Sequence, residues 1–170
     1  IPNPNSQLPT SRRSAVVQFP ASNLQWAEGK CVSFGQGLAY HLLMDLLRSL
    51  IGAAAAAGEA ETRGALLALM GRLGDDFALE VYPFLGHLLS LQLEGQALER
   101  VKSLDPQALQ GQYLAALRRL LTALAARNPL ALILDDVHWA DPSSTELLIK
   151  LLPLTASSPL LFCIVTRPDR

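Results

Sequence analysis

The stretch from residue 129 to residue 144 decides the fold of this chain. It reads Pro129-Leu130-Ala131-Leu132-Ile133-Leu134-Asp135-Asp136-Val137-His138-Trp139-Ala140-Asp141-Pro142-Ser143-Ser144. Its five consecutive apolar residues are too few to cross a membrane and are typical of a strand buried on both faces. In an open parallel sheet, ligands bind beyond the carboxyl ends of the strands. The stretch therefore predicts a buried strand over residues 130–134, with Asp135 and Asp136 at a ligand site.

The residues that follow predict a second strand parallel to the first. Residues 145–152 suit a short helix, 153–159 a loop, and 160–165 a second continuous apolar strand. A helix between two buried strands is the βαβ unit of a parallel sheet. The expected fold class is therefore α/β, with residues 130–134 and 160–165 as neighbouring strands.

Two segments resemble a known family. Residues 130–141 resemble the Walker B strand of P-loop ATPases, and the extension from Asp135 to Asp141 is similar to signal-transduction ATPases of the AAA-like, STAND type. The pattern W-x-E-G-x-C-x-S from Trp26 to Ser33 is similar to the second strand of the same ATPases. The resemblance covers residues 24–52 and 106–170, and such modules accompany adenylate cyclase domains or LuxR-type regulators. It implies a helix-rich, P-loop NTPase-like parallel sheet that works with Mg²⁺ and ATP.

The two adjacent acids, Asp135 and Asp136, can take different roles, one in binding a metal ion and one in orienting water. Mg²⁺ prefers oxygen ligands and keeps several waters, so Asp135 at the strand tip can hold the ion directly or through water. Asp136 can orient or deprotonate the water that attacks the γ-phosphate, which makes it the catalytic candidate. The alternative is purely structural: a buried strand followed by a helix that Asp141 caps. We expect Asp141 to be a structural cap and the two adjacent acids to be functional.

The end of the second strand supplies the remaining candidates. Thr166 and Arg167 follow residues 160–165 directly. In the ATPases that this chain resembles, this tip is the sensor strand, where a polar or basic residue contacts the γ-phosphate, and a guanidinium can bind phosphate oxygens in pairs. The alternative for Arg167 is a solvated arginine at a strand end. Both residues are candidates for nucleotide binding.

The phosphate-binding loop is missing from the sequence. No G-x-x-x-x-G-K-S/T motif occurs among the 170 residues. In the family the loop would fall near residues 6–13, where Ser11 and Arg12 correspond to the S-R of G-K-S-R and Thr10 stands in place of the lysine. The loop was lost by truncation or frameshift, or the chain is a degenerate copy. The chain also lacks an initial methionine, and we expect it to be a segment of a longer protein.

The remaining sequence predicts a helix-rich domain. From the resemblance we expect residues 1–23 to be an irregular or degenerate P-loop region and residues 24–170 to be the ATPase domain, with a variable helical insertion at 53–105. Strand composition at 24–26 and 31–34 is interrupted at 28–30. A turn at 35–37 precedes a helix whose apolar face carries Tyr40, Leu43, Leu47, Leu50 and Ile51.

Helices are also expected in the insertion. The alanine run at 53–57 and the leucines of 66–70 predict helix, and Gly71 and Gly74 predict a break. A further helix over 77–93 is interrupted at Pro83, and Asp105-Pro106 opens the next one.

The net charge and the cysteine content limit the classes of partner that the sequence predicts. The net charge is −1 and no basic stripe appears, which gives no electrostatic case for direct binding to nucleic acid or to a membrane. Cys31 and Cys163 lie in apolar runs and are expected to be core residues in a reducing cytoplasm. We expect the partners to be a nucleotide and other domains of a parent regulator, and the sequence leaves a homo-oligomer open. The alternative function is a non-catalytic helical scaffold or interaction module on the same fold.

Overall fold

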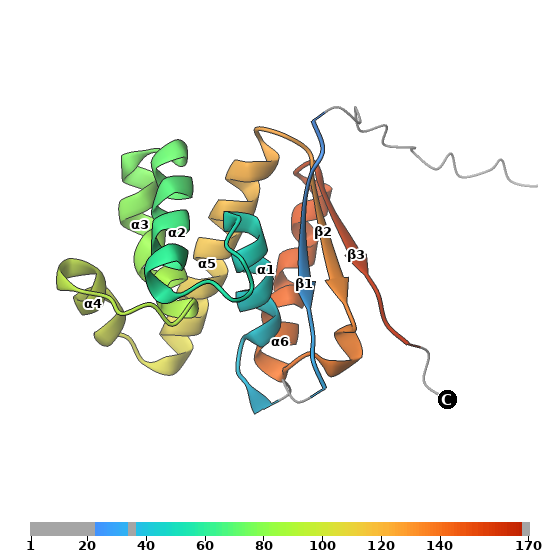
Figure 1. Ribbon diagram of the computed structural model, residues 1–170, viewed down its shortest axis with the longest axis horizontal. Helices are drawn as coiled ribbons and strands as arrows, with labels where there is room; N and C mark the ends of the chain where they lie inside the picture. Colours follow the sequence, from blue (N-terminus) through green and yellow to red (C-terminus); the bar gives the residue numbers. More distant parts are fainter. Residues whose placement is uncertain (1–22, 34–36, 168–170) are drawn as a thin grey trace, which may run out of the picture.

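The computed structural model describes residues 23–33 and 37–167, and within them it shows a parallel sheet beside a layer of helices (Figure 1). The elements in chain order are β1 (Gln25–Lys30), α1 (His41–Ile51), α2 (Glu59–Leu73), α3 (Asp75–Leu88), α4 (Gly95–Lys102), α5 (Pro106–Ala125), β2 (Leu130–Asp135), the 3-10 helix η2 (Val137–Trp139), α6 (Pro142–Leu151), the 3-10 helix η3 (Leu152–Ala156) and β3 (Leu160–Ile164). The predicted α/β class is confirmed.

The predicted βαβ unit is present. The sheet has the strand order β1-β2-β3, and β2 pairs with β3 in parallel, from Leu130 opposite Leu160 to Leu134 opposite Ile164. Helix α6 connects the two strands and begins three residues earlier than residue 145, because Asp141 caps it and Pro142 occupies its first turn. The prediction of neighbouring parallel strands is confirmed.

The expected interruption of β1 at residues 28–30 is wrong. Strand β1 runs through Gly29 and pairs in parallel with β2 as far as Lys30, opposite Asp135. A Cβ on Gly29 would lie 2.9 Å from the Cβ of Leu46, so the glycine permits α1 to pack closely on the strand. Residues 31–33, which were expected to be strand, lie beyond the end of the paired region. The turn expected at 35–37 falls largely outside the described residues.

The helices cover one face of the sheet. Figure 1 shows α1, α5 and α6 beside the strands, with α2, α3 and α4 farther away. Side chains alternate along a strand, and those that point toward the helices, such as Ala27, Leu132 and Leu134, are 0–1% exposed. We call the opposite side the open face; the register places on it Trp26, Glu28, Lys30, Ala131, Ile133, Asp135, Leu161 and Cys163, and Val165 continues the same alternation beyond β3.

The open face corrects two predictions about burial. The sequence predicted that both strands are covered on both faces, but Leu161 is 49% exposed. Cys163, expected in the core, is an exposed free thiol, whereas Cys31 is buried as expected. A continuous apolar run in β3 therefore did not mean that both faces of this strand are buried.

The insertion is helical, but its boundaries differ from those expected. The alanine run at 53–57 is not helical, because α1 ends at Gly52, whose left-handed φ of 74° turns the chain. Gly71 lies inside α2 and does not break it, whereas Gly74 does separate α2 from α3. The assignment of 53–105 as a variable insertion stays a prediction.

Pro83 lies inside α3 without interrupting the helix, contrary to the prediction. A proline has no N–H to donate to the carbonyl four residues earlier, which here belongs to Leu79. That carbonyl instead accepts a hydrogen bond of 2.5 Å from Nη1 of Arg100, and the Arg100 guanidinium lies 5.2 Å from the centre of the Phe84 ring. Helix α4 thus supplies the donor that the proline lacks. The helix ends at Leu88, before the expected residue 93.

The long helix α5 matches its sequence signals. Asp105 caps it by accepting a hydrogen bond of 2.8 Å from the amide of Ala108, and Pro106 occupies the first turn. Its apolar side joins a single hydrophobic core shared by the sheet and the helices. None of the helices in the described part of the chain is both long and apolar enough to cross a membrane.

Candidate functional site

The candidate site lies where β2 and β3 end. Asp135 is the last residue of β2, and Asp136 follows it with a left-handed backbone at φ 54°, a conformation that is costly for a residue other than glycine. The amide of Val165 donates to the Leu134 carbonyl at 2.8 Å, and the amide of Val137 donates to the Val165 carbonyl at 3.1 Å. These bonds hold the two strand ends together, as the sequence predicted for the acids and Arg167.

Asp135 lies beside a cation that sequence reasoning missed. Its Oδ2 atom lies 3.6 Å from Nζ of Lys30, and its Oδ1 accepts a hydrogen bond of 2.9 Å from the amide of Asp136. The interruption expected at residues 28–30 left Lys30 off the sheet, whereas a strand that continues through Gly29 brings Lys30 to the carboxyl edge. The Lys30 side chain is 57% exposed, so this ion pair contributes little stability and leaves Oδ2 free to bind another cation.

Asp136 lies between two basic side chains. Its Oδ1 is 3.7 Å from Nε of Arg167 and 4.0 Å from Nδ1 of His138. The Asp136 side chain is 24% exposed, whereas that of Arg167 is 78% exposed and extends into solvent. The hydroxyl of Thr166 bonds the Arg167 carbonyl at 3.4 Å. The structure therefore brings Arg167 to Asp136, and Thr166 to the same strand end.

The acids suit a Mg²⁺ ion that takes only one or two of its ligands from the protein. Among residues 23–33 and 37–167, no group of three or more His, Cys, Asp or Glu side chains is arranged to hold a metal ion. Mg²⁺ bound to ATP takes most of its ligands from water and phosphate, so a single carboxylate oxygen such as Oδ2 of Asp135 is sufficient. The residues present fit such a role. The expected loop segment, 6–13, lies outside the described residues.

Burial and the carboxylates at this end of the sheet both affect the ionisation of Cys31. Burial raises the pKa of the Cys31 thiol to about 11, with further contributions from the carboxylates of Asp141, Asp136, Asp45 and Asp135. At neutral pH the side chain is therefore a thiol and is a poor nucleophile. The cysteine provides packing next to the site, and the acids around it favour cations.

Asp141 caps α6 and also joins two distant segments. Its Oδ1 accepts hydrogen bonds of 2.8 Å from the amide of Ser144 and from the amide of Tyr40, which precedes α1. The residue is only 2% exposed. The predicted cap is confirmed, while the bond to Tyr40, which adopts a left-handed φ of 63°, was not visible in the sequence.

We expect Asp141→Ala to destabilise the protein by about 2–4 kcal/mol. Loss of a cap costs roughly 1–2 kcal/mol, and the Tyr40 amide left without its acceptor costs roughly the same again. The matched control is Asp105→Ala, which removes an exposed cap with a single bond and should cost about 1 kcal/mol. Urea denaturation measures both. Equal losses for the two variants would show that the Tyr40 bond contributes nothing.

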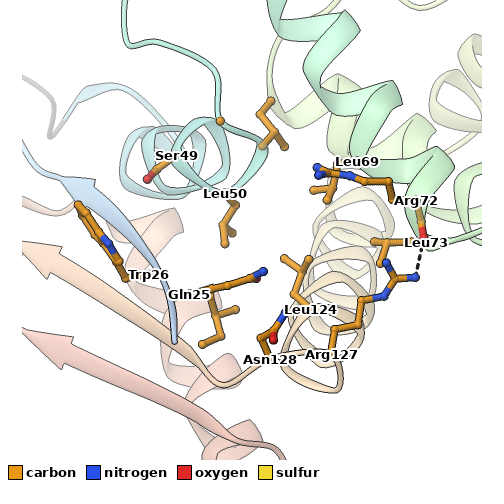
Figure 2. A pocket seen from close by; sticks show the side chains of 13 residues that line it. Gln25, Trp26, Ser49, Leu50, Leu69, Arg72, Leu73, Leu124, Arg127 and Asn128 are labelled. Atoms are coloured by element: carbon orange, nitrogen blue, oxygen red, sulfur yellow. Dashed lines mark hydrogen bonds between the residues drawn. The ribbon is translucent and has the colours of Figure 1, made fainter. Parts of the chain in front are cut away.

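A hollow of about 520 Å³ lies at the opposite, amino end of the sheet, away from the acids (Figure 2). Leu50, Leu69 and Leu124 form part of its wall, and Gln25 and Asn128 lie at its lower side in the view. The Arg127 guanidinium is held there by a hydrogen bond of 2.5 Å to the carbonyl of Arg72. None of the sequence-predicted site residues lines this hollow.

A known protein and a family model match this chain. The chain is 32% identical over 130 residues to an uncharacterised protein, R02095, of Rhizobium meliloti (strain 1021); the match covers 75% of this chain and 12% of that protein. No solved structure matched the chain. The profile of a family described as "AAA ATPase domain" matches residues 12–165. The chain therefore belongs to the AAA ATPase domain family.

Proposed function

We propose that this chain is the nucleotide-binding part of a STAND-type signal-transduction ATPase, with ATP binding and hydrolysis coupled to a conformational switch. The observation that carries the proposal is the pair Asp135-Asp136 at the carboxyl end of a buried parallel strand, with Arg167 of the neighbouring strand end 3.7 Å from Asp136. This is the place in a parallel sheet where ligands bind.

Each residue has a role in this proposal. Asp135 would hold Mg²⁺ through its carboxylate, and the ion would supply charge stabilisation to the phosphates. Asp136 orients the water that attacks the γ-phosphorus as the bond to the ADP oxygen breaks. Arg167 and Thr166 contact the γ-phosphate, and the exposed guanidinium has the freedom to turn from Asp136 toward it.

The match covers 12% of the length of R02095. We propose that the partners of this chain are other domains of a larger regulator in the cytoplasm, with the nucleotide as the ligand that sets their arrangement. The net charge of −1 favours neither nucleic acid nor an anionic membrane as a partner of this segment.

A second candidate is a non-catalytic scaffold on the same fold. It is favoured by the sequence, which has no P-loop motif, and by the cations beside both acids, since Lys30 and Arg167 balance Asp135 and Asp136 without a metal. Under this hypothesis the acids and Arg167 only support the strand ends.

A variant with the loop restored separates the two functions. The substitutions Pro4→Gly, Pro9→Gly and Thr10→Lys convert residues 4–11 to G-N-S-Q-L-G-K-S, and we call this chain the loop-restored variant. In it, Arg167→Ala should retain ADP affinity and lose about tenfold or more in preference for ATP, because a charge-assisted contact to the γ-phosphate contributes roughly 1.5–3 kcal/mol. Calorimetric titration with each nucleotide measures the preference.

The control for this test is Arg119→Ala. Arg119 pairs with Glu80 on the surface between α5 and α3, away from the strand ends, and its loss removes the same charge. It should change neither affinity. If Arg167→Ala weakens ATP and ADP equally, or neither, the arginine does not contact the γ-phosphate and the scaffold is favoured.

A further inference from the structure

The hollow at the amino end of the sheet has the size and the lining of a small-molecule site (Figure 2). Its volume of about 520 Å³ lies within the range of ligand pockets. The ends of α1, α2 and α5 surround it, and they contribute Leu50, Leu73 and Leu124 to its wall. The strand side is formed by Gln25 and Leu130, the first residues of β1 and β2. A ligand in the hollow would therefore contact the sheet and all three helices.

The charged side chains that line the hollow are both basic. Arg72 and Arg127 line it, and no aspartate or glutamate does. Within the part of the chain that the structure describes, neither guanidinium forms an ion pair with a carboxylate. One N–H group of Arg127 donates to the Arg72 carbonyl, which leaves most donors of the two guanidinium groups available to a ligand. In a chain whose net charge is −1, this local positive charge indicates an anionic ligand.

The helix ends limit how much negative charge that ligand carries. Each helix C-terminus has roughly half a negative charge, which arises from carbonyls without a partner in the helix. The ends of α1, α2 and α5 therefore offset most of the positive charge of the two arginines. A carboxylate with a single charge fits the remaining positive charge, whereas a diphosphate or triphosphate carries too many negative charges for it. The leucines of the wall suit an apolar group attached to that carboxylate.

We propose that the hollow binds a small organic monocarboxylate that has an apolar chain or ring. Figure 2 shows Leu50 and Leu124 pointing toward the middle of the hollow, where the apolar part of the ligand lies. The carboxylate lies between the guanidinium groups of Arg72 and Arg127, and because both side chains are exposed they have the freedom to reach it. The Gln25 side chain extends from β1 into the hollow and can donate to the same carboxylate.

The probe for this proposal is octanoate, a monocarboxylate with an aliphatic chain, titrated calorimetrically into the unmodified chain. Acetate, which lacks the chain, and octanol, which lacks the charge, are the ligand controls. We expect saturable binding of octanoate and at least about tenfold weaker binding of each control, because each control loses one of the two kinds of contact. The proposal is overturned if octanoate shows no saturable binding, or if octanol binds as tightly as octanoate does.

Single substitutions test whether octanoate uses the two arginines. Arg72→Ala and Arg127→Ala should each weaken octanoate binding about fivefold to tenfold, a modest factor because both side chains are exposed. The matched control is Arg118→Ala. Arg118 is an exposed arginine that donates to the Lys150 carbonyl at 2.6 Å and does not line the hollow. Its loss removes the same charge and the same kind of hydrogen bond as the loss of Arg127, and it should leave the octanoate affinity unchanged.

Equal octanoate affinities for the three variants would overturn the proposal. If Arg127→Ala lowers the thermal midpoint of unfolding more than Arg118→Ala does, the result for Arg72→Ala decides. The Arg72 side chain, unlike that of Arg127, does not bond another segment of the described chain, so its loss tests binding without loosening α2.

Methyl NMR identifies where octanoate binds. The methyl signals of Leu50 and Leu124 should shift on titration, whereas those of Leu161, which is 49% exposed on the open face, should not. Shifts of Leu161 without shifts of Leu50 and Leu124 would place octanoate on the open face and overturn the proposal. The hollow lies at the opposite end of the sheet from Asp135 and Asp136, and these measurements need no nucleotide. A failure here therefore leaves the proposed function untouched.

Discussion

Asp136→Asn in the loop-restored variant is expected to lower the rate of ATP hydrolysis by about 10²–10⁴-fold while ATP affinity stays within about twofold. The amide keeps the size of the carboxylate but cannot accept the proton of the attacking water. It removes a contribution made in the transition state and not in the bound ground state. Single-turnover hydrolysis beside equilibrium titration measures the two quantities separately.

The neighbouring acid provides the contrast. Asp135→Asn should weaken Mg-ATP binding as well as turnover, because the metal bound to the phosphates loses its carboxylate ligand. Without magnesium, the same variant should bind ATP as the loop-restored parent does. Equal losses of affinity for both substitutions would mean that the two acids support the strand ends and have no separate roles.

Local sequence signals predicted the parts of this site that depend on near neighbours. The apolar run before Asp135 and Asp136 gave a parallel strand with its acids at the carboxyl end. Asp141 followed by Pro142 gave a capped helix. These features are set by hydrogen bonds and side-chain burial within a few residues, which a single sequence contains.

Features that depend on distant segments were missed. Gly29 suggested a break in the strand, but the structure needs glycine there because Leu46 of α1 packs closely against it. Pro83 suggested an interruption, but Arg100 donates to the carbonyl that the proline leaves without a partner. Lys30 reached Asp135 only through the pairing of β1 with β2. In each case the deciding contact comes from an element distant in the chain, and residue order alone does not reveal it.

The unmodified chain is expected to bind Mg-ATP at least about a hundredfold more weakly than the loop-restored variant. A P-loop provides several charge-assisted hydrogen bonds to the phosphates, each worth on the order of 1.5–3 kcal/mol, and the loss of two of them gives this factor. Asp135 cannot compensate, because it binds a metal that arrives with the phosphates, and Lys30 beside it is a single, solvated charge.

Calorimetry can separate the causes of this weaker Mg-ATP binding. It is measured on the unmodified chain, on the loop-restored variant and on the single variant Thr10→Lys. The lysine alone should recover part of the affinity as a point charge, whereas the glycines are needed for the backbone amides to approach the phosphates. MgCl₂ without nucleotide is the control and should give no measurable heat at Asp135. Micromolar affinity for Mg-ATP in the unmodified chain would contradict the prediction, because phosphate binding would then not depend on the missing glycines and lysine.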